Sequence, residues 1–407
     1  MKRVGFGDII KIDTKTLEVS MKEVSVIACP DYSDENVRSA LRSALDEIGG
    51  LDFVTPGMKI AIKANLVSYM KPEKAATTHP ALLSALTKIL TDMGAEVVIG
   101  DSPGGLYNSL YVNRVYSAAG MKETEKYGAR LNQNYDVAEA RFEGGAQLKD
   151  FTYTSYLDEA DAIINFCKLK SHGMMSLSCA VKNMFGVIPG TMKPEYHYRF
   201  PNHADFANMI VDINEYFRNK VKLCICDAVV GMEGNGPTAG DPRQIGAVLA
   251  SRSPYSLDLV AAKLIGLTKE NVPTLEAAHL RGLAPESADG IDVSDSYERF
   301  TVHDFKNITT HSSLEFKNFM SGKLGQVFGS LVGALLRSKP KVHKNLCVGC
   351  AVCEKICPAK AIVIKDGIAV IDRKDCIRCF CCQEFCPKGA MKVKRTVIAR
   401  IFVHNKK

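Results

Sequence analysis

The chain has 407 residues, of which 46% are hydrophobic and 24% are charged, and its formal net charge is +7. No stretch reaches the roughly 18 apolar residues of a membrane helix, and the N-terminal MKRVGFGDIIKIDTK lacks the apolar core of a signal peptide. The 14 cysteines indicate a reducing compartment. We therefore expect a cytoplasmic protein. The excess of positive charge lies in residues 341–395, which contain twelve Lys/Arg and five Asp/Glu. The sequence motifs of nucleic-acid-binding proteins are absent, so we expect no nucleic-acid partner.

Residues 1–320 predict an α/β domain with a mostly parallel sheet and flanking helices. Short apolar runs alternate there with helix-like stretches, and runs that are apolar throughout indicate strands buried on both faces. The predicted strands are 24–28, 59–62, 96–99, 162–166 and 222–226. The predicted helices are 34–48 and 80–93, the second with Thr78 as a candidate N-cap.

Polar residues follow four of these strands directly. They are Lys63 and Asn65; Asp101, Ser102, Pro103, Gly104 and Gly105; Lys168, Lys170 and His172; and Asp227, Glu233, Gly234, Asn235 and Gly236. Open α/β sheets bind ligands at the carboxyl ends of their strands, so these groups predict one crevice. With Lys182 added, the crevice is rich in lysine, and its glycines let backbone N–H groups approach a carboxylate or phosphate. His79, His172 and His197 are candidate titrating or ligating groups.

Each polar feature also has a structural explanation. A lysine after a strand is usually a solvated loop residue, and Lys168 and Lys170 alternate with apolar neighbours as on an exposed strand edge. Cys224 and Cys226 indicate buried apolar thiols. No G-x-G-x-x-G follows a strand and no Walker A motif is present, so a dinucleotide or P-loop site is not supported.

Two stretches, NFCKLKSHGMMSLSCAVKNMFGVIPG and DAVVGMEGNGPTAGDPRQIGAVLAS, carry a family resemblance. They resemble the family known as domain of unknown function 362, over residues 20–265, and its members often carry a ferredoxin module. The residues in its motifs are Lys168, Lys170, His172, Lys182, Asn183, Gly186, Asp227, Glu233, Gly234, Asn235 and Gly236. The motifs are specific for the family and not for a reaction. We also consider a distant similarity in fold to lactate-racemase-like proteins, but carry no nickel chemistry over because no ligand set here demands it.

Residues 267–340 separate this domain from the C-terminal module. Residues 267–320 are polar and predict loops, and a linker is expected at 321–340. Its apolar stretch LGQVFGSLVGALL, 324–336, predicts a helix that docks the C-terminal module, or alternatively a membrane-surface or partner-binding helix. The tail, 396–407, either packs back onto the body or is loose.

Residues 341–395 repeat the cysteine spacing C-x2-C-x2-C-x3-C-P. This run holds paired [4Fe–4S] clusters, and its fourth cysteine crosses to the other cluster. It predicts cluster 1 on Cys347, Cys350, Cys353 and Cys386, and cluster 2 on Cys376, Cys379, Cys382 and Cys357. Zinc sites are the alternative, but they usually pair two C-x2-C units across a longer gap.

The same segment resembles bacterial two-cluster ferredoxin modules, which have a small α+β fold. Asp366-Gly367 between IVIK and IAVI predicts a hairpin with a type I′ turn. Cys381 is extra to the pattern, and is either a packed thiol, which we favour, or an alternative ligand.

Three hypotheses follow for function. In the first, a redox enzyme takes electrons from a ferredoxin or flavodoxin and passes them to an anionic substrate or cofactor in the crevice. Its candidate catalytic residues are Lys168, Lys170 and Lys182 for positioning, His172 as proton donor, and Asp227 and Glu233 to orient these groups or bind a metal. In the second, the chain is an electron carrier or a subunit of a redox complex. In the third, the clusters are structural or sensory and the α/β domain binds a ligand.

Overall fold

The computed structural model describes residues 21–308 and 339–394. The apolar stretch 324–336, most of the linker that contains it, and the tail 396–407 lie outside the described residues, so the predictions made for them stay predictions. Within the described residues, no helix combines the length and the apolar character that crossing a membrane requires.

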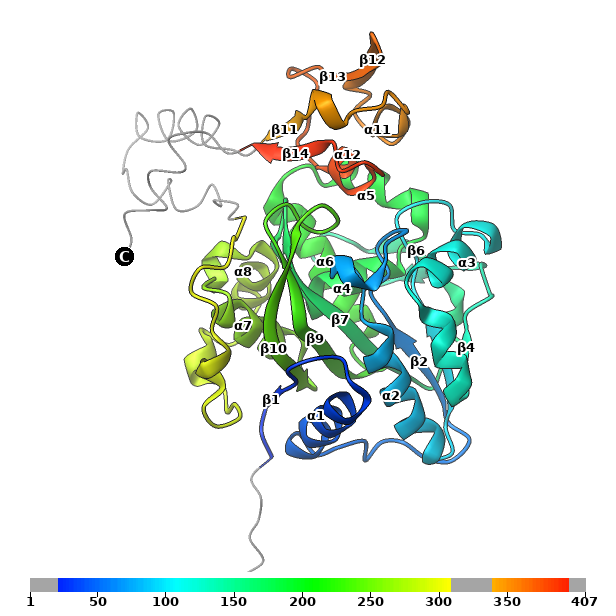
Figure 1. The fold of residues 1–407 in the computed structure, drawn as a ribbon, viewed down its shortest axis with the longest axis vertical. Helices are drawn as coiled ribbons and strands as arrows, with labels where there is room; N and C mark the ends of the chain where they lie inside the picture. The colour runs from blue at the N-terminus through cyan, green and yellow to red at the C-terminus, as the bar shows by residue number, and fades with distance from the viewer. Residues whose placement is uncertain (1–20, 309–338, 395–407) are drawn as a thin grey trace, which may run out of the picture.

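The centre of the α/β domain is an eight-stranded sheet (Figure 1). Its order is β1 (Val24–Ala28), β10 (Asp241–Ser251), β9 (Val221–Glu233), β7 (Ala162–His172), β2 (Lys59–Lys63), β3 (Glu96–Gly100) and β4 (Ala129–Leu131), and β8 (Ser176–Ser178) pairs with β7. Strands β9, β7, β2, β3 and β4 run parallel, whereas β10 is antiparallel to both of its neighbours. The prediction of a mostly parallel α/β sheet is therefore confirmed.

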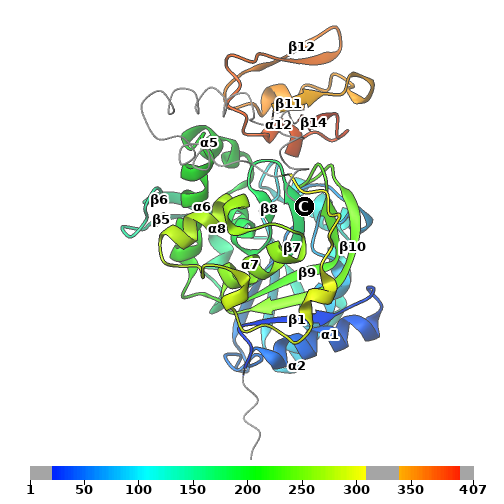
Figure 2. The same ribbon diagram turned by 90° about the vertical axis from the view of Figure 1, so that its left-hand side faces the viewer.

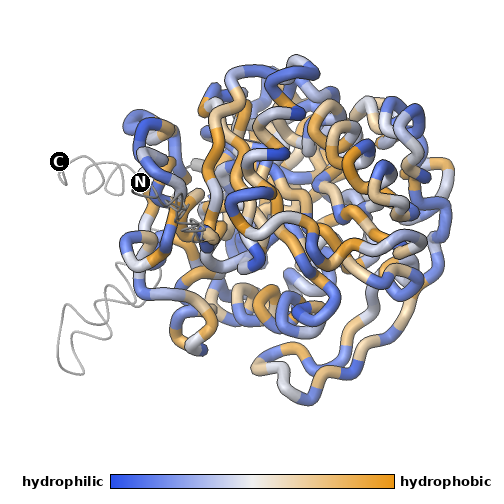
Figure 3. Tube along the Cα trace, turned by 90° about the horizontal axis from the view of Figure 1, so that it is seen from below, coloured by the Kyte–Doolittle hydropathy of each residue, from blue (hydrophilic) through white to orange (hydrophobic). Residues whose placement is uncertain are grey.

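Helices cover both faces of the sheet, and a separate hydrophobic core lies on each (Figures 1 and 2). One face packs against α1 (Asp34–Glu47), α2 (Pro80–Asp92) and α3 (Ser109–Ala118). The other packs against α4 (Ala180–Asn183), α6 (His203–Phe217), α7 (Pro254–Leu264) and α8 (Pro273–Leu280). Hydrophobic residues accordingly concentrate in the middle of the molecule in Figure 3.

The five predicted strands and both predicted helices are present, but β7 and β9 extend well past their predicted ends. Lys168, Lys170 and His172 lie inside β7, and Asp227 and Glu233 lie inside β9, rather than in loops after these strands. Both lysines are buried, so the exposed-edge explanation is wrong. Helix α2 begins after His79, whose Nδ1 accepts from Ala81 N, so His79 and not Thr78 is the N-cap.

Shorter elements complete the α/β domain. A separate hairpin is formed by β5 (Val137–Arg141) and β6 (Asp150–Thr154), and α5 (Lys193–Arg199) follows α4. Helix α8 lies in the segment from 267 that was predicted to be loops, because Leu275, Ala277 and Ala278 are buried in the core that it shares with α6 and α7.

The C-terminal module is a small α+β domain with short antiparallel strands. Strand β11 (Lys339–Val342) pairs with β14 (Met391–Lys394), and β12 (Ile362–Lys365) pairs with β13 (Ile368–Ile371). Two one-turn helices, α11 (Val352–Lys355) and α12 (Cys381–Glu384), lie between them. Asp366 and Gly367 have φ of 50° and 72°, which is the backbone that a type I′ turn needs, so the predicted hairpin is confirmed.

The module sits over the carboxyl ends of the central parallel strands, with α12 and β14 facing the α/β domain (Figures 1 and 2). Gln383 on α12 donates to the carbonyls of Asn235 and Gly236 at 2.7 and 2.9 Å. The side chain of Asn235 in turn accepts from Val393 N at 3.1 Å. The Glu-Gly-Asn-Gly-Pro stretch that follows β9 is therefore part of the contact between the two domains.

Candidate functional site: two cluster pockets above a lysine cavity

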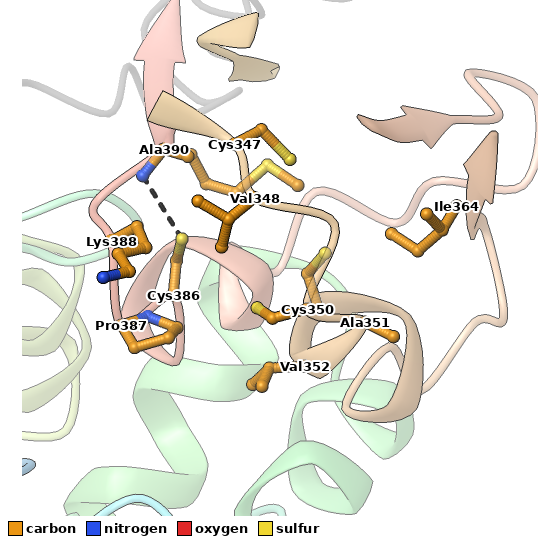
Figure 4. Close-up of a pocket in the computed structure, with 12 residues that line it drawn as sticks. Cys347, Val348, Cys350, Ala351, Val352, Ile364, Cys386, Pro387, Lys388 and Ala390 are labelled. Carbon is orange, nitrogen blue, oxygen red and sulfur yellow. Dashed lines mark hydrogen bonds between the residues drawn. The ribbon is translucent and has the colours of Figure 1, made fainter. Parts of the chain in front are cut away.

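The cysteines of the C-terminal module gather in two pockets. One is lined by Cys347, Cys350, Cys353 and Cys386, and Figure 4 shows three of these labelled side chains around it. The other is lined by Cys357, Cys376, Cys379, Cys382 and Cys381. Each pocket thus contains three cysteines of one run and the fourth cysteine of the other run, as the crossed assignment predicts.

The two crossing cysteines have matching surroundings. Ala361 N donates to Cys357 Sγ at 3.3 Å, and Ala390 N donates to Cys386 Sγ at 3.2 Å (Figure 4). Four sulfur donors around each pocket are what a [4Fe–4S] cube requires, and N–H donors to the sulfurs tune its potential. Cys381 is 1% exposed and belongs to the second pocket, where Cys357, Cys376, Cys379 and Cys382 already supply four thiolates.

Directly beneath the module lies a polar cavity of about 70 Å³, here called the lysine cavity. Its charged lining residues are Lys63, Lys170, Lys182, Lys193, Asp101 and Glu384, and His172, Asn183, Gly186 and Phe385 also line it. The carboxyl ends of β2 and β3 supply Lys63 and Asp101, β7 supplies Lys170 and His172, and α4 supplies Lys182. A water-sized space needs about 10–15 Å³, so the cavity holds several waters or a small anionic group.

A hydrogen-bond network fixes the floor of the lysine cavity. Lys63 Nζ lies 2.7 Å from Asp101 Oδ1 and donates to Asn183 Oδ1 at 3.0 Å. Asn65 Nδ2 donates to the same Asn183 oxygen at 2.9 Å, and its own Oδ1 accepts from Lys170 Nζ at 2.8 Å. An ideal Cβ on Gly186 would lie 2.3 Å from Lys63 Nζ, so a glycine is needed there. Buried charges persist only with such partners.

Two of the lysines have strongly lowered pKa values. Burial lowers the pKa of Lys170 to about 7, against the opposing effect of Asp101. Burial likewise lowers the pKa of Lys193 to about 7, although its ammonium donates to the carbonyls of Ser102 and Ile188 at 2.7 and 2.6 Å. Burial also lowers the pKa of Lys63 and of Lys182. The cavity contains four lysines against two carboxylates, an excess of two positive groups that a bound anion would relieve.

Lys182 differs from the other cavity lysines because its ammonium makes no hydrogen bond or ion pair with any residue that the structure describes. Its side chain is only 9% exposed. Nζ lies 4.4 Å from the ring centroid of Phe185 and 5.8 Å from that of Phe206, both cation–π contacts. It is therefore the cavity group best placed to bind an incoming anion.

His172 connects the lysine cavity to the module. Its Nδ1 accepts from the backbone N–H groups of Met174 and Met175 at 3.1 and 3.2 Å, and its Nε2 lies 3.1 Å from Glu384 Oε1. This arrangement fits a neutral ring that donates from Nε2. Burial lowers the pKa of His172 although Glu384 raises it. Burial opposes ionisation of Glu384, but His172, Lys182 and His197 together outweigh it and lower the Glu384 pKa to about 2.

Lys168 and Asp227 form a separate buried cluster and do not line the lysine cavity. Lys168 Nζ lies 2.7 Å from Asp227 Oδ2 and donates to Tyr32 OH at 2.8 Å. Asp227 also accepts from Tyr32 OH and from His79 N at 2.9 and 3.0 Å. The rings of Tyr32 and His79 stack at 3.6 Å, and burial lowers the pKa of His79 to about 4.

Neither Glu233 nor His197 lines the lysine cavity. Glu233 Oε1 is 3.1 Å from Lys306 Nζ, and its Oε2 accepts from Lys306 N at 3.1 Å. His197 stacks on Phe206 at 4.2 Å, and burial lowers its pKa to about 3. Of the six predicted catalytic residues, the structure brings only Lys170, His172 and Lys182 together in the cavity.

Several cavity residues were not predicted from the sequence, among them Lys193, Glu384 and Phe385. Lys193 lies on a helix far from any predicted strand end, and Glu384 and Phe385 belong to the cysteine-rich module. The only local signal for the last two is their position between Cys382 and Cys386. Their contact with the α/β domain depends on how the two domains pack.

Comparisons with known proteins identify both parts of the chain. A model of a domain of unknown function, DUF362, matches residues 60–263, which is half of the chain. The chain belongs to the DUF362 family. A model of a 4Fe-4S dicluster domain matches residues 339–387, so the protein is an iron–sulfur protein with two [4Fe–4S] clusters.

Among curated proteins, the chain is similar to a thylakoid-associated protein, sll1697, of Synechocystis sp. The two are 31% identical over 277 residues, which are 66% of this chain and 82% of that protein. Its printed name gives an association with thylakoids and no reaction, so the likeness supports the family without assigning an activity.

Two solved structures show weaker likenesses. One is a Thermotoga maritima protein with a TM-score of 0.33 and 13% identity, covering 53% of this chain and 55% of that one. The other is lactate racemase apoprotein from Thermoanaerobacterium thermosaccharolyticum, with a TM-score of 0.35 and 12% identity, covering 57% and 54%. The chain thus spans about half the length of each.

Proposed function

We propose that this DUF362 protein is an iron–sulfur oxidoreductase whose clusters exchange single electrons with an anion bound in the lysine cavity. The observation that carries the proposal is the position of Glu384 and Phe385. Both line the cavity, and both lie between Cys382 and Cys386, one predicted ligand of each cluster. Two residues span at most roughly 7 Å, so a bound anion would lie beside the segment that holds both clusters.

The cavity residues have distinct roles in this proposal. The free ammonium of Lys182 binds the anion, and Lys63, held by Asp101, adds positive charge at the floor. Lys170, whose pKa is about 7, is better suited than His172 to supply a proton near neutral pH. His172 instead positions Glu384, whose Oε1 lies 3.1 Å from His172 Nε2.

The expected partner is an electron donor of ferredoxin or flavodoxin type, because each cluster takes up one electron at a time. We propose a cytoplasmic location, since eight reduced cysteines are needed for cluster assembly.

The test uses the holoprotein under anaerobic conditions. Clusters reduced with dithionite, then freed of excess reductant, are mixed with candidate carboxylates and phosphate esters, and their reoxidation is followed by EPR. Lys182→Met should slow anion-dependent reoxidation at least about tenfold without changing iron content or the EPR signals. The surface variant Lys88→Met is the matched control.

Other outcomes point to the rival functions. Equal reoxidation in Lys182→Met and wild type would favour an electron carrier or a subunit of a redox complex. Clusters that cannot be reduced at low potential would favour structural or sensory clusters.

A further inference from the structure

A second and larger cavity lies beside the lysine cavity, between the two domains. It has a volume of about 1480 Å³ and is here called the interdomain cleft. The two cavities share the residues Gly104, Glu384 and Phe385. The cleft also reaches Cys357 and Cys386, one predicted ligand of each cluster. Ligand sites are frequent at domain interfaces, and here the two spaces adjoin at three residues, so that a movement of the Phe385 side chain would join them.

Phe385 and Gly104 form the boundary between the two cavities. An ideal Cβ on Gly104 would lie 3.0 Å from Phe385 Cζ and 3.3 Å from the Val67 carbonyl, so the ring packs directly on the glycine backbone. Tyr111 OH donates to the Gly104 carbonyl at 2.7 Å and fixes the same turn from the cleft side. A ligand that reaches the lysine cavity from the cleft therefore passes next to an aromatic ring.

The wall of the cleft combines nine charged residues with a group of exposed apolar and aromatic side chains. Tyr69, Leu106 and Tyr198 line it, and each is 58% exposed. Tyr111 and Phe385 add two further aromatic rings. Scattered exposed apolar side chains are normal, but several around one cleft mark a binding surface. Tyrosine and phenylalanine rings pack well against a planar aromatic group, either edge-to-face or offset-stacked.

The lysine cavity is polar and small, in contrast to the cleft. Its volume of about 70 Å³ is large enough for an anionic group but too small for an aromatic ring system. It contains an excess of two positive groups. Lys182 is 9% exposed, and its ammonium makes no hydrogen bond or ion pair with any residue that the structure describes. The polar end of a ligand therefore belongs in this cavity and the apolar end in the cleft.

We propose that the ligand of this protein is an aromatic acid. Its anionic group binds Lys182 in the lysine cavity, and its ring lies in the interdomain cleft against Tyr69, Tyr198 and Phe385, beside Cys386. The inference rests on the proposed function for the identity of the site, and goes beyond it by naming the class of molecule.

The test is equilibrium binding to the anaerobic holoprotein by calorimetry. The probes are acetate, benzoate, 2-naphthoate and, as an uncharged control, benzyl alcohol. Affinity should rise about tenfold or more from acetate to 2-naphthoate, and benzyl alcohol should not bind. The double variant Tyr69→Ser/Tyr198→Ser should lose most of the higher affinity for 2-naphthoate relative to acetate. The control variant Tyr127→Ser, which changes an exposed tyrosine outside the cleft, should retain this higher affinity. Lys182→Met should weaken binding of all three acids.

The outcomes separate this inference from the proposed function. If acetate and 2-naphthoate bind equally, or if Lys182→Met leaves 2-naphthoate binding unchanged, the aromatic-acid inference is wrong while the redox proposal stands. If the series binds as expected but no carboxylate or phosphate ester that carries a reducible group reoxidises the clusters in the EPR assay, the redox proposal is wrong and the inference stands. If no acid binds, the aromatic-acid inference is wrong, and the reoxidation assay decides the redox proposal separately.

Discussion

Lys170 and Lys193 lie in one cavity, and burial lowers the pKa of each to about 7. Asp101 and Glu384 raise both values, and neighbouring lysines lower them. Each residue is thus close to an even balance of charged and neutral forms at neutral pH. A bound anion stabilises the charged form and raises the lysine pKa, which couples binding to proton uptake.

This coupling predicts a pH dependence of anion binding. Affinity for acetate or benzoate should fall by about tenfold per titrating lysine between about pH 6 and pH 8, because the free lysines lose their protons over that range. Binding at the higher pH should take up protons, which calorimetry in Tris and imidazole buffers measures. Lys170→Met should show a shallower pH profile. Affinity that is constant over this range would contradict the prediction.

Cys381 provides a second prediction at the scale of single residues. Because four other cysteines line the second cluster pocket, Cys381→Ala should retain about eight iron atoms per chain and both EPR signals. Cys379→Ala should lose about half of the iron. Iron analysis and EPR of the two purified variants provide the comparison, and iron loss in Cys381→Ala would identify that thiol as a ligand.

Strands β7 and β9 show which features of the elements the sequence predicts and which it does not. Their starts were predicted at residues 162 and 222, because continuous apolar runs mark buried parallel strands, and the observed strands begin at Ala162 and Val221. Their ends were not, because Lys168 and Lys170 resemble loop residues in sequence. Each lysine is buried by partners from distant segments, Asp227 for one and Asn65 for the other. Sequence reasoning therefore found the lysines but misjudged their surroundings.

The Lys168–Asp227 pair predicts a large effect on stability. Lys168→Met leaves the fully buried Asp227 carboxylate without its cation, which typically costs about 3–5 kcal/mol. Lys88→Met, which breaks an exposed helix pair with Asp92, should cost only about 0.3–0.5 kcal/mol. Urea unfolding followed by circular dichroism measures both. The double variant Lys168→Met/Asp227→Leu should recover part of the loss, and a small effect of the single change would mean that Asp227 is neutral.

At the scale of the whole molecule, the two domains together form the candidate site. The cysteine spacing predicted the clusters, and the strand ends predicted an anion site, but nothing local to either segment predicted that α12 covers the cavity. The contact depends on Gln383, which is fully buried and donates to two carbonyls of the other domain. A glutamine beside a cluster ligand has no distinctive sequence signal, so this half of the site appears only once both domains are folded.

The Gln383→Ala substitution should therefore weaken the contact between the C-terminal module and the α/β domain without loss of iron from the module. The two carbonyls of Asn235 and Gly236 lose their donor, at a cost of about 1–3 kcal/mol for a buried unsatisfied group. Hydrogen exchange should rise in residues 233–238 and 383–390, whereas iron content should stay constant. Gln133→Ala, which breaks a surface hydrogen bond with Asn113, is the control. Unchanged exchange in Gln383→Ala would mean that other contacts hold the module.

Because α12 begins at Cys381, between predicted ligands of cluster 2, its folding depends on the supply of iron. A newly made protein in an iron-starved cell would thus have a finished α/β domain with its cavity open to water. We expect such a chain to bind small anions but to have no cluster that could exchange electrons with them. The supply of iron would then determine whether the site is active.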